Sequence, residues 1–424
     1  MSKDAPKVVV SGYYGYDNCG DEAVLLSIVT CLKTLHPGIR IIALSGNPSK
    51  TSELYGIEAI NRWNPFRIAI SLLSSQLLIS GGGSLFQDAT STKSLRYYLA
   101  IIKMAKMLGK KVMVFSQGIG PLNREKSRAM VSKTLNRCNA ITVRDEQSAH
   151  LLVDIGITKK IQVTADPAII LETKDISIDI PSELQKTNKN GGEDSLFLVD
   201  ACYGSSGIMQ EPPITGKREH HEKGEKTATN IDCDTSMKTS ISQGTHNRSS
   251  VPLLTVAIRS WQDDRHLPHV ARFLDKRVEE GFSALIIPTH FPNDVHACTR
   301  ILSMMTQQAH FMNKCFSAWE FIALAAQSDY FFSMRLHGLI CAFASGTPIL
   351  ALSYDPKVDA FMTQTGLSEY CIDFDNFDSQ IAENLFAKLL SPQPQESITQ
   401  QETLRENLRK SAWSSAEIAI NLLD

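Results

Sequence analysis

The sequence predicts an α/β fold made of two domains. At 424 residues the chain exceeds what one ordinary hydrophobic core holds, so two cores are expected. Short apolar runs typical of buried strands alternate with helical stretches, and glycine-rich or polar turns follow the strands. A polar stretch with few aliphatic side chains, 186–250, interrupts this pattern. We therefore expect domains at 1–185 and 251–424, joined by a disordered insertion or linker.

The individual strands and helices follow from the same alternation of apolar and polar segments. In the first half we expect strands at 7–11, 40–45, 76–80 and 111–116, two more that begin at 140 and 161, and a helix over 95–108. In the second half we expect strands at 253–259, 283–288, 329–333 and 348–353, a helix over 267–281 and a helical tail over 381–423.

A glycine-rich turn follows the first strand and leads into a helix near residue 22. The turn lacks both the GxGxxG pattern of dinucleotide sites and the GK[ST] sequence of ATP-binding loops, which argues against those ligands. Its Gly15 allows the backbone to approach a ligand, while Asn18 and Asp21 either bind hydroxyl groups or cap the helix. The sequence allows both roles for Asp21.

The strand at 76–80 runs directly into three successive glycines, which include Gly82 and Gly83. Glycines placed there weaken packing, so we expect that the backbone comes close to a substrate. Polar side chains follow this strand at Gln87 and Asp88 and the next strand at Gln117. We therefore place these five residues in a cleft.

The richest stretch for chemistry is the strand, helix and strand at 329–353, which form one βαβ unit. Arg335 and His337 lie on the turn that opens the helix, where free N–H groups and the helix dipole favour an anion. Lys357 lies at the matching end of the next strand, so the three side chains are expected to converge on one anionic ligand. The alternative is that Arg335 and Lys357 are solvated and His337 caps the helix.

Two other residues follow strands in the same way. Arg144 comes at the end of the strand that begins at 140, and it joins the candidate anion ligands unless it pairs with Asp145 or Glu146. His290 follows the strand at 283–288, which places it among the candidate cleft residues.

Composition limits the functional classes. The net charge is −2, and outside short helical runs such as 103–111 the chain has no basic stripe of the kind that a nucleic-acid-binding protein shows. Nine scattered cysteines without CxxC pairs fit neither a zinc site nor a disulfide framework. The stretch 68–80 is too short and too polar to span a membrane. We expect a cytoplasmic protein with at most a peripheral association with the inner face of the membrane.

Several motifs together resemble the polysaccharide pyruvyl transferase family, above all its CsaB-type cell-wall members. They are GYYGYDNCGDEAVL at 12–25, SGGGSLFQDATS at 80–91, FSQGIGP at 115–121, the residues 143–145, ADPA at 165–168 and the stretch 335–357. They run in order through both halves and leave out 186–250. The resemblance implies two Rossmann-like domains in a GT-B-like arrangement. It also implies phosphoenolpyruvate as co-substrate, held mainly by the second domain, with no other cofactor and no metal.

The resemblance also implies an acceptor and the roles of individual residues. The acceptor is a sugar, for this subgroup a β-linked N-acetylmannosamine of a lipid-linked cell-wall precursor. Arg144, Arg335, His337 and Lys357 match donor-site positions, and Asn18 and Asp21 match the cleft.

The implied reaction transfers pyruvate as a ketal across two sugar hydroxyls and releases phosphate. Its chemistry needs a proton donor and a base, for which His337 and Asp21 are suitable. Two alternatives remain on the sequence alone. One is a GT-B-type glycosyltransferase that uses a nucleotide sugar, and the other is a non-catalytic sugar-binding protein of the same fold.

Overall fold

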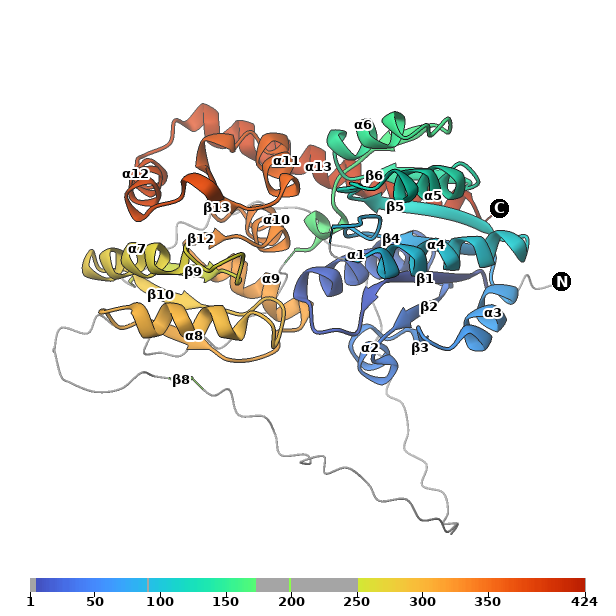
Figure 1. The fold of residues 1–424 in the computed structure, drawn as a ribbon, viewed down its shortest axis with the longest axis horizontal. Helices are drawn as coiled ribbons and strands as arrows, with labels where there is room; N and C mark the ends of the chain where they lie inside the picture. Colours follow the sequence, from blue (N-terminus) through green and yellow to red (C-terminus); the bar gives the residue numbers. More distant parts are fainter. Residues whose placement is uncertain (1–4, 90, 173–197, 200–250, 424) are drawn as a thin grey trace, which may run out of the picture. The chain divides into compact units, whose positions relative to one another are not determined.

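The computed structural model of the protein describes residues 5–89, 91–172, 198–199 and 251–423. Its first sheet has seven parallel strands in the order β3-β2-β1-β4-β5-β6-β7 (Figure 1). The strands are β1 (Lys7–Tyr14), β2 (Arg40–Ser45), β3 (Glu58–Asn61), β4 (Leu77–Gly81), β5 (Lys111–Gln117), β6 (Ala140–Val143) and β7 (Ile161–Val163). The helices of this half are α1 (Cys19–Leu35), α2 (Pro48–Tyr55), α3 (Pro65–Leu73), α4 (Thr92–Met107), α5 (Glu125–Leu135), α6 (Glu146–Asp154) and the 3₁₀ helix η1 (Pro167–Ile170).

The second sheet is also parallel and has the order β14-β13-β12-β9-β10-β11-β8. Its strands are β8 (Leu198–Val199), β9 (Leu253–Ala257), β10 (Ser283–Ile286), β11 (His310–Met312), β12 (Tyr330–Ser333), β13 (Ile349–Ser353) and β14 (Cys371–Asp373). Its helices are α7 (Leu267–Glu279), α8 (Val295–Met304), α9 (Ala318–Gln327), α10 (Leu336–Ala344), α11 (Pro356–Gln364), η3 (Ser368–Tyr370), η4 (Phe374–Asn376), α12 (Ser379–Leu390) and α13 (Gln395–Asn421).

Each sheet has a point between two central strands where its strand order reverses, and these two points position the candidate site. In the first sheet the reversal lies between β1 and β4, where Val9 pairs with Leu78. In the second it lies between β9 and β12, where Phe331 pairs with Thr255. At such a point the two connections leave in opposite directions and open a crevice at the carboxyl ends of the strands. The turns after β1, β4, β9 and β12 are therefore the natural ligand-binding segments.

Helix α1 packs between the two halves of the fold. Along β1, Val8 and Val10 face one core and Val9 faces the other, as strand alternation requires. The core on the Val8 side includes α1 and continues into the second half, while α3, α4, α5 and α6 cover the opposite face. Most of α1 is buried, since it also contacts α9, α10 and α13 (Figure 1). A helix enclosed on several sides needs apolar residues around most of its circumference, and α1 has them.

The last long helix, α13, returns to the first half of the chain. It packs against α1, η1 and β5. The fully buried Ser415 hydroxyl lies 2.8 Å from Ser116 Oγ, 3.0 Å from Thr142 Oγ1 and 3.2 Å from Thr164 Oγ1. These hydroxyls satisfy one another where water is excluded, so they fix the position of α13 on the sheet.

The predicted α/β class, with two Rossmann-like domains in a GT-B-like arrangement, is confirmed by the two parallel sheets and by the related structures described below. All predicted strands are present, several of them with shifted ends. The predicted polar insertion at 186–250 lies outside the described residues except for β8, which pairs with β11 at the edge of the second sheet. No helix in the described ranges is long and apolar enough to cross a membrane.

Replacing Ser415 by valine tests the hydroxyl cluster under α13. We expect Ser415→Val to lower the free energy of unfolding by about 1–3 kcal/mol, because buried hydroxyls lose a hydrogen-bond partner. Urea denaturation measures this change. Thr399→Val, at an exposed position of the same helix where water can replace the lost hydroxyl, serves as the control and should change stability by less than about 0.5 kcal/mol. Equal stability of the two variants would contradict the assigned role of Ser415.

Candidate functional site

A cavity of about 520 Å³ lies at the carboxyl ends of both sheets. It is lined by the turns that follow β1, β4, β9 and β12, together with the starts of α4, α10 and α11. Eight of the predicted site residues line it: Asn18, Asp21, Gln87, Arg144, His290, Arg335, His337 and Lys357. The lining also contains residues that the sequence did not single out as site residues, among them Tyr13, Ser84, Tyr98, Arg259 and Tyr354.

The three predicted glycines do not line the cavity. Gly15, Gly82 and Gly83 have positive φ angles of 77°, 51° and 71°. A Cβ atom on Gly82 would lie 1.9 Å from Cγ1 of Val24 on α1, and one on Gly83 would lie 2.9 Å from Oδ1 of Asp21. The close backbone approach that the glycine run indicates is therefore to α1 and its carboxylate, and an approach to substrate stays a prediction.

Asp88 and Gln117 also lie outside the lining and bind neighbouring backbone. The Asp88 carboxylate accepts hydrogen bonds from the N–H groups of Asn123 and Arg124 at 2.8 and 2.9 Å. Gln117 is fully buried, and its amide donates to the carbonyl oxygens of Ser80 and Gly82. Both residues hold the loops beneath the cavity in place.

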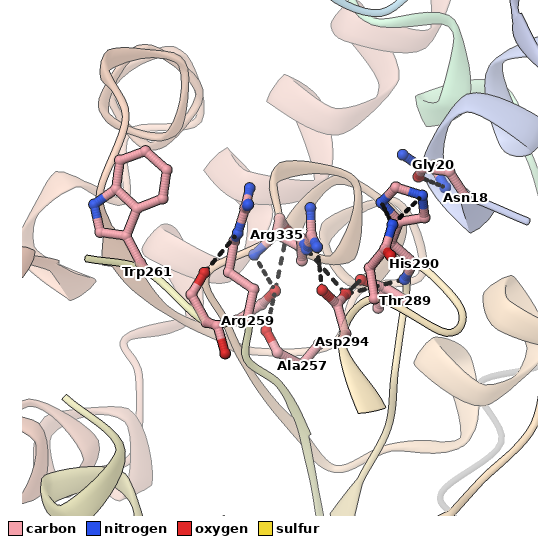
Figure 2. A network of polar contacts seen from close by, with 12 residues as sticks. Asn18, Gly20, Ala257, Arg259, Trp261, Thr289, His290, Asp294 and Arg335 are labelled. Carbon is pink, nitrogen blue, oxygen red and sulfur yellow. Dashed lines mark hydrogen bonds and ion pairs between the residues drawn. The ribbon is translucent and has the colours of Figure 1, made fainter. Parts of the chain in front are cut away.

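The start of α1 is fastened to the second half of the chain. Asn18 caps the helix by accepting a hydrogen bond from the Gly20 N–H at 3.1 Å (Figure 2). Asn18 also forms an isolated antiparallel bridge with His290, and the Cys19 N–H donates to the Thr289 carbonyl at 3.0 Å. These backbone contacts bring the turn after β1 against the turn after β10.

Asp21 is the carboxylate that lines the cavity. Burial raises its pKa to about 6, with a further increase from Glu22, while His337 and Lys357 counteract that rise. No hydrogen bond to its side chain is found within the described residues. The helix cap is formed by Asn18, so the interpretation of Asp21 as a cap is replaced by that of a partly buried cavity acid with a raised pKa.

His337 lies in the first turn of α10 and faces the start of α1. A Cβ on Gly20 would lie 2.1 Å from His337 Nδ1, so only glycine leaves room for the ring. On its other side, Nε2 lies 3.6 Å from Oδ2 of Asp166, which is longer than a hydrogen bond. Asp166 is thus close enough to balance a positive charge on the ring, although it forms no hydrogen bond to Nε2.

Arg144 extends into the cavity wall from the end of β6. Its guanidinium contacts Asp145 at 3.1 Å, Asp166 at 3.3 Å and Ser84 Oγ at 3.2 Å. Arg144 therefore pairs with Asp145, which the sequence left as an alternative, and it also lines the cavity. Burial alone would raise the pKa of Asp166, but the nearby His337 and Arg144 outweigh it and hold that pKa below its ordinary value.

Arg335 occupies the cap position of α10 and pairs with Asp294. Nε donates to Asp294 Oδ2 at 3.1 Å, and a second N–H donates to Oδ1. Asp294 is 2% exposed and also accepts hydrogen bonds from Thr289 Oγ1 and the His290 N–H. Figure 2 shows Arg259, Arg335 and His290 extending from the ends of separate strands around this carboxylate. The bidentate pair fixes the direction of Arg335.

Lys357, Arg259 and Tyr354 form the remaining cationic side of the cavity. Lys357 Nζ lies 3.0 Å from Asp355 Oδ2, and the Arg259 guanidinium donates to Tyr354 Oη at 3.2 Å. Arg259 makes no ion pair within the described part of the chain. Burial would raise the pKa of Tyr354, but Lys357, Arg335 and Arg259 lower it below its ordinary value.

Some residues of the site that were not predicted still stand at recognisable positions in the sequence. Arg259 ends the apolar strand at 253–259, and Asp166 belongs to the ADPA motif, so both positions were visible. Nothing in the sequence indicates that Tyr354 lies among cations. Within the described ranges, no group of three or more His, Cys, Asp or Glu side chains is arranged to hold a metal ion.

Solved structures of UDP-sugar enzymes share the fold. A UDP complex of MnaA from S. aureus is 10% identical, with 98% of this chain and 97% of that chain covered at a TM-score of 0.59. UDP-GlcNAc 2-epimerase from Methanocaldococcus jannaschii is 12% identical, with 98% and 99% covered at a TM-score of 0.56. Another UDP-N-acetylglucosamine 2-epimerase is 12% identical, with 99% and 96% covered at 0.58. At such low sequence identities, these matches show only that the fold is shared.

A sequence model of one family gives a more specific match. The model for polysaccharide pyruvyl transferase matches residues 18–356, which is most of the chain and includes helix α1 and the turns after β4, β9 and β12. No curated protein matches the sequence significantly.

Neutralising Asp21 should stabilise the protein in a pH-dependent way. The folded-state pKa of about 6 lies above the ordinary value of 3.8, so the folded protein loses stability as pH rises through this range. At pH 8, Asp21→Asn should therefore raise the free energy of unfolding by about 3 kcal/mol, while near pH 4 the difference should fall below about 1 kcal/mol. Urea denaturation at both pH values measures this, with the exposed Asp154→Asn as control. A pH-independent difference would contradict the assignment.

Proposed function

Because the chain belongs to the polysaccharide pyruvyl transferase family, we propose that it transfers pyruvate from phosphoenolpyruvate to two hydroxyl groups of one sugar. The acceptor is part of a cell-wall or extracellular polysaccharide precursor, and the products are a pyruvate ketal and phosphate. The observation that carries the proposal is the cavity at the two strand-order reversals, whose lining brings four cations together with a histidine and a partly buried acid.

The charge of the donor matches the groups around the cavity. Phosphoenolpyruvate carries a carboxylate and a phosphate, and such anions are bound best by fixed cations with directed N–H groups. Arg259 is available for this role because it has no carboxylate partner in the described chain, and Lys357 lies close to it across the Tyr354 ring. Arg335 and Arg144 contribute N–H groups not used by their carboxylates. The donor thus sits mainly on the second half of the fold.

The chemistry requires a proton on carbon 3 of the donor and a hydroxyl oxygen on carbon 2. In the first step, His337 donates a proton to the methylene carbon while Asp21 removes the proton of the attacking hydroxyl. The second hydroxyl then forms the second C–O bond to carbon 2 as the bond to the phosphate oxygen breaks. The proton of this second hydroxyl leaves with the phosphate. Asp166 supports this sequence by balancing the positive charge of the protonated His337 ring.

The acceptor occupies the side of the cavity formed by the first half. Asn18, Gln87 and the hydroxyl groups of Ser91 and Ser94 offer hydrogen bonds to a sugar, and Tyr13 and Tyr98 offer aromatic surface. We place the saccharide of a lipid-linked precursor here, beside the start of α4. No cofactor or metal ion enters the proposed reaction.

The choice of donor can be tested by thermal unfolding and by product analysis. Phosphoenolpyruvate should raise the Tm, since a ligand that binds only the folded protein stabilises it, whereas UDP-sugars should not. With synthetic or lipid-linked sugars as acceptors, phosphate release should accompany a gain in acceptor mass. Stabilisation by a UDP-sugar without any effect of millimolar phosphoenolpyruvate would instead support the glycosyltransferase alternative. Binding without turnover on any acceptor would favour a non-catalytic sugar-binding protein.

Mutant kinetics can separate the proton donor from the donor-binding cation. His337→Gln should lower kcat by about 10²- to 10⁴-fold with little change in donor binding, because a general acid acts in the chemical step. Arg259→Gln should weaken phosphoenolpyruvate binding by about 10- to 100-fold with a smaller effect on kcat, because a charge-assisted hydrogen bond is lost. Arg272→Gln, an exposed arginine on α7, is the matched control. A His337→Gln variant with normal kcat but poor donor binding would reassign His337 as an anion ligand.

A further inference from the structure

Helix α3 is apolar on both of its faces. Its inner face buries Ile68 and Leu72 in the core above the first sheet. Its outer face presents Phe66, Ile70 and Leu73, which are 81%, 65% and 58% exposed at a spacing that places them on one stripe. A helix that is apolar all round is normally covered on all sides, so the outer stripe requires a partner.

The stripe continues onto neighbouring positions. Six large apolar side chains in the described chain are more than half exposed, and five of them belong here: Trp63, Phe66, Ile70, Leu73 and Met107. Trp63 directly precedes α3, and Met107 ends α4, which packs beside α3 on the same face of the sheet (Figure 1). We call these five residues the α3–α4 surface. Such a concentration marks a docking surface and not the usual scatter of single exposed side chains.

The segment that carries this surface is strongly basic. Residues 59–124 contain nine lysines and arginines and one acidic residue, Asp88, in a chain whose net charge is −2. Asp88 is 4% exposed and binds backbone N–H groups, so it does not offset the surface charge. On α4, Lys93, Arg96 and Lys103 are exposed at helical spacing, and Arg67 is exposed on α3. The apolar stripe is thus bordered by cations that form no ion pair with the described residues.

The surface lies next to the acceptor side of the cavity. The start of α4 lines the cavity with Ser94 and Tyr98, while Tyr97 packs at 5.1 Å from Trp63. The Arg62 guanidinium lies over the rings of Trp63, Tyr97 and Tyr98, at 4.5 to 5.4 Å. A continuous aromatic cluster therefore connects the α3–α4 surface with the cavity wall.

We propose that the α3–α4 surface docks onto an anionic lipid bilayer. Apolar side chains with a tryptophan beside them enter the headgroup region, and bordering lysines and arginines bind anionic headgroups. A protein partner would also need complementary acids, whereas a bilayer supplies a uniform negative surface over the whole face. In this orientation the cavity opens beside the membrane, which suits a lipid-linked acceptor. The link to a lipid-linked acceptor rests on the proposed function, whereas the docking onto the bilayer does not.

Vesicle binding tests the proposal without using the transferase reaction. The purified full-length protein should co-sediment with vesicles of phosphatidylcholine and phosphatidylglycerol, and only weakly with phosphatidylcholine alone. Binding should fall as ionic strength rises. The double variant Arg96→Glu/Lys103→Glu should lower the partition coefficient by at least about 25-fold, since each lost cation is worth about fivefold and the anionic surface also repels the two new carboxylates. Phe66→Ser/Ile70→Ser should lower it by about tenfold or more.

Matched variants distinguish this surface from general effects. Val153→Ser removes the one other large apolar side chain that is more than half exposed in the described chain, and Lys159→Glu/Lys160→Glu reverses two exposed charges elsewhere; both should bind as the unaltered protein does. The fluorescence of Trp63 should shift to the blue on binding, and Trp63→Phe should abolish the contribution of this residue to the shift. Equal binding by all variants would overturn the proposal, as would absence of binding to anionic vesicles. So would light scattering that shows Phe66→Ser/Ile70→Ser only dissociating a dimer.

Discussion

The buried carboxylate of Asp166 links the two halves of the candidate site. It lies after β7, is 5% exposed, and faces Arg144 from the first sheet and His337 from the second. A carboxylate excluded from water is tolerated only when cations or donors surround it. The depressed pKa of Asp166 indicates that these partners outweigh burial. The position of His337 relative to Arg144 is therefore fixed by charge compensation at Asp166, and the rest of the cavity is arranged around this link.

The location of the site could be predicted from the sequence because strand ends are easy to recognise. In parallel sheets the residues that follow each strand meet at one edge, so Asn18, Arg144, Arg335, His337 and Lys357 are expected to be neighbours once the strands are known. The structure places all five in the lining of one cavity. Assigning these residues to the ligand-binding edge required no knowledge of strand order, because the carboxyl ends of all strands in a parallel sheet lie at the same edge.

The pairing of charges could not be predicted, because it depends on strand order and on side-chain directions. Asp294 follows β10 and lies 41 residues before Arg335, and nothing in the local sequence joins them. The packing partner of the glycine run was hidden for a related reason. The sequence indicates that Gly82 needs a close neighbour, but only the packing of α1 identifies that neighbour as Val24. The exposure of Phe66 was likewise hidden, because a short apolar helix has the same sequence whether one face or both are covered.

The charges around the cavity nearly cancel, which limits how an anionic donor can be held. The charged groups in and behind its wall are Arg144, Arg259, Arg335, Lys357, Asp21, Asp145, Asp166, Asp294 and Asp355. Because these groups include more acids than cations, the trianion phosphoenolpyruvate gains little from their net electrostatic field. It must therefore rely on short, directed hydrogen bonds. Arg259 offers these without displacing a carboxylate, whereas Arg335 must be shared with Asp294. Removal of Arg335 or Arg144 would leave a buried carboxylate without its partner and mix lost stability with lost binding. The contribution of the cations to donor recognition is therefore best judged at Arg259 and Lys357, whose loss uncovers no deeply buried acid.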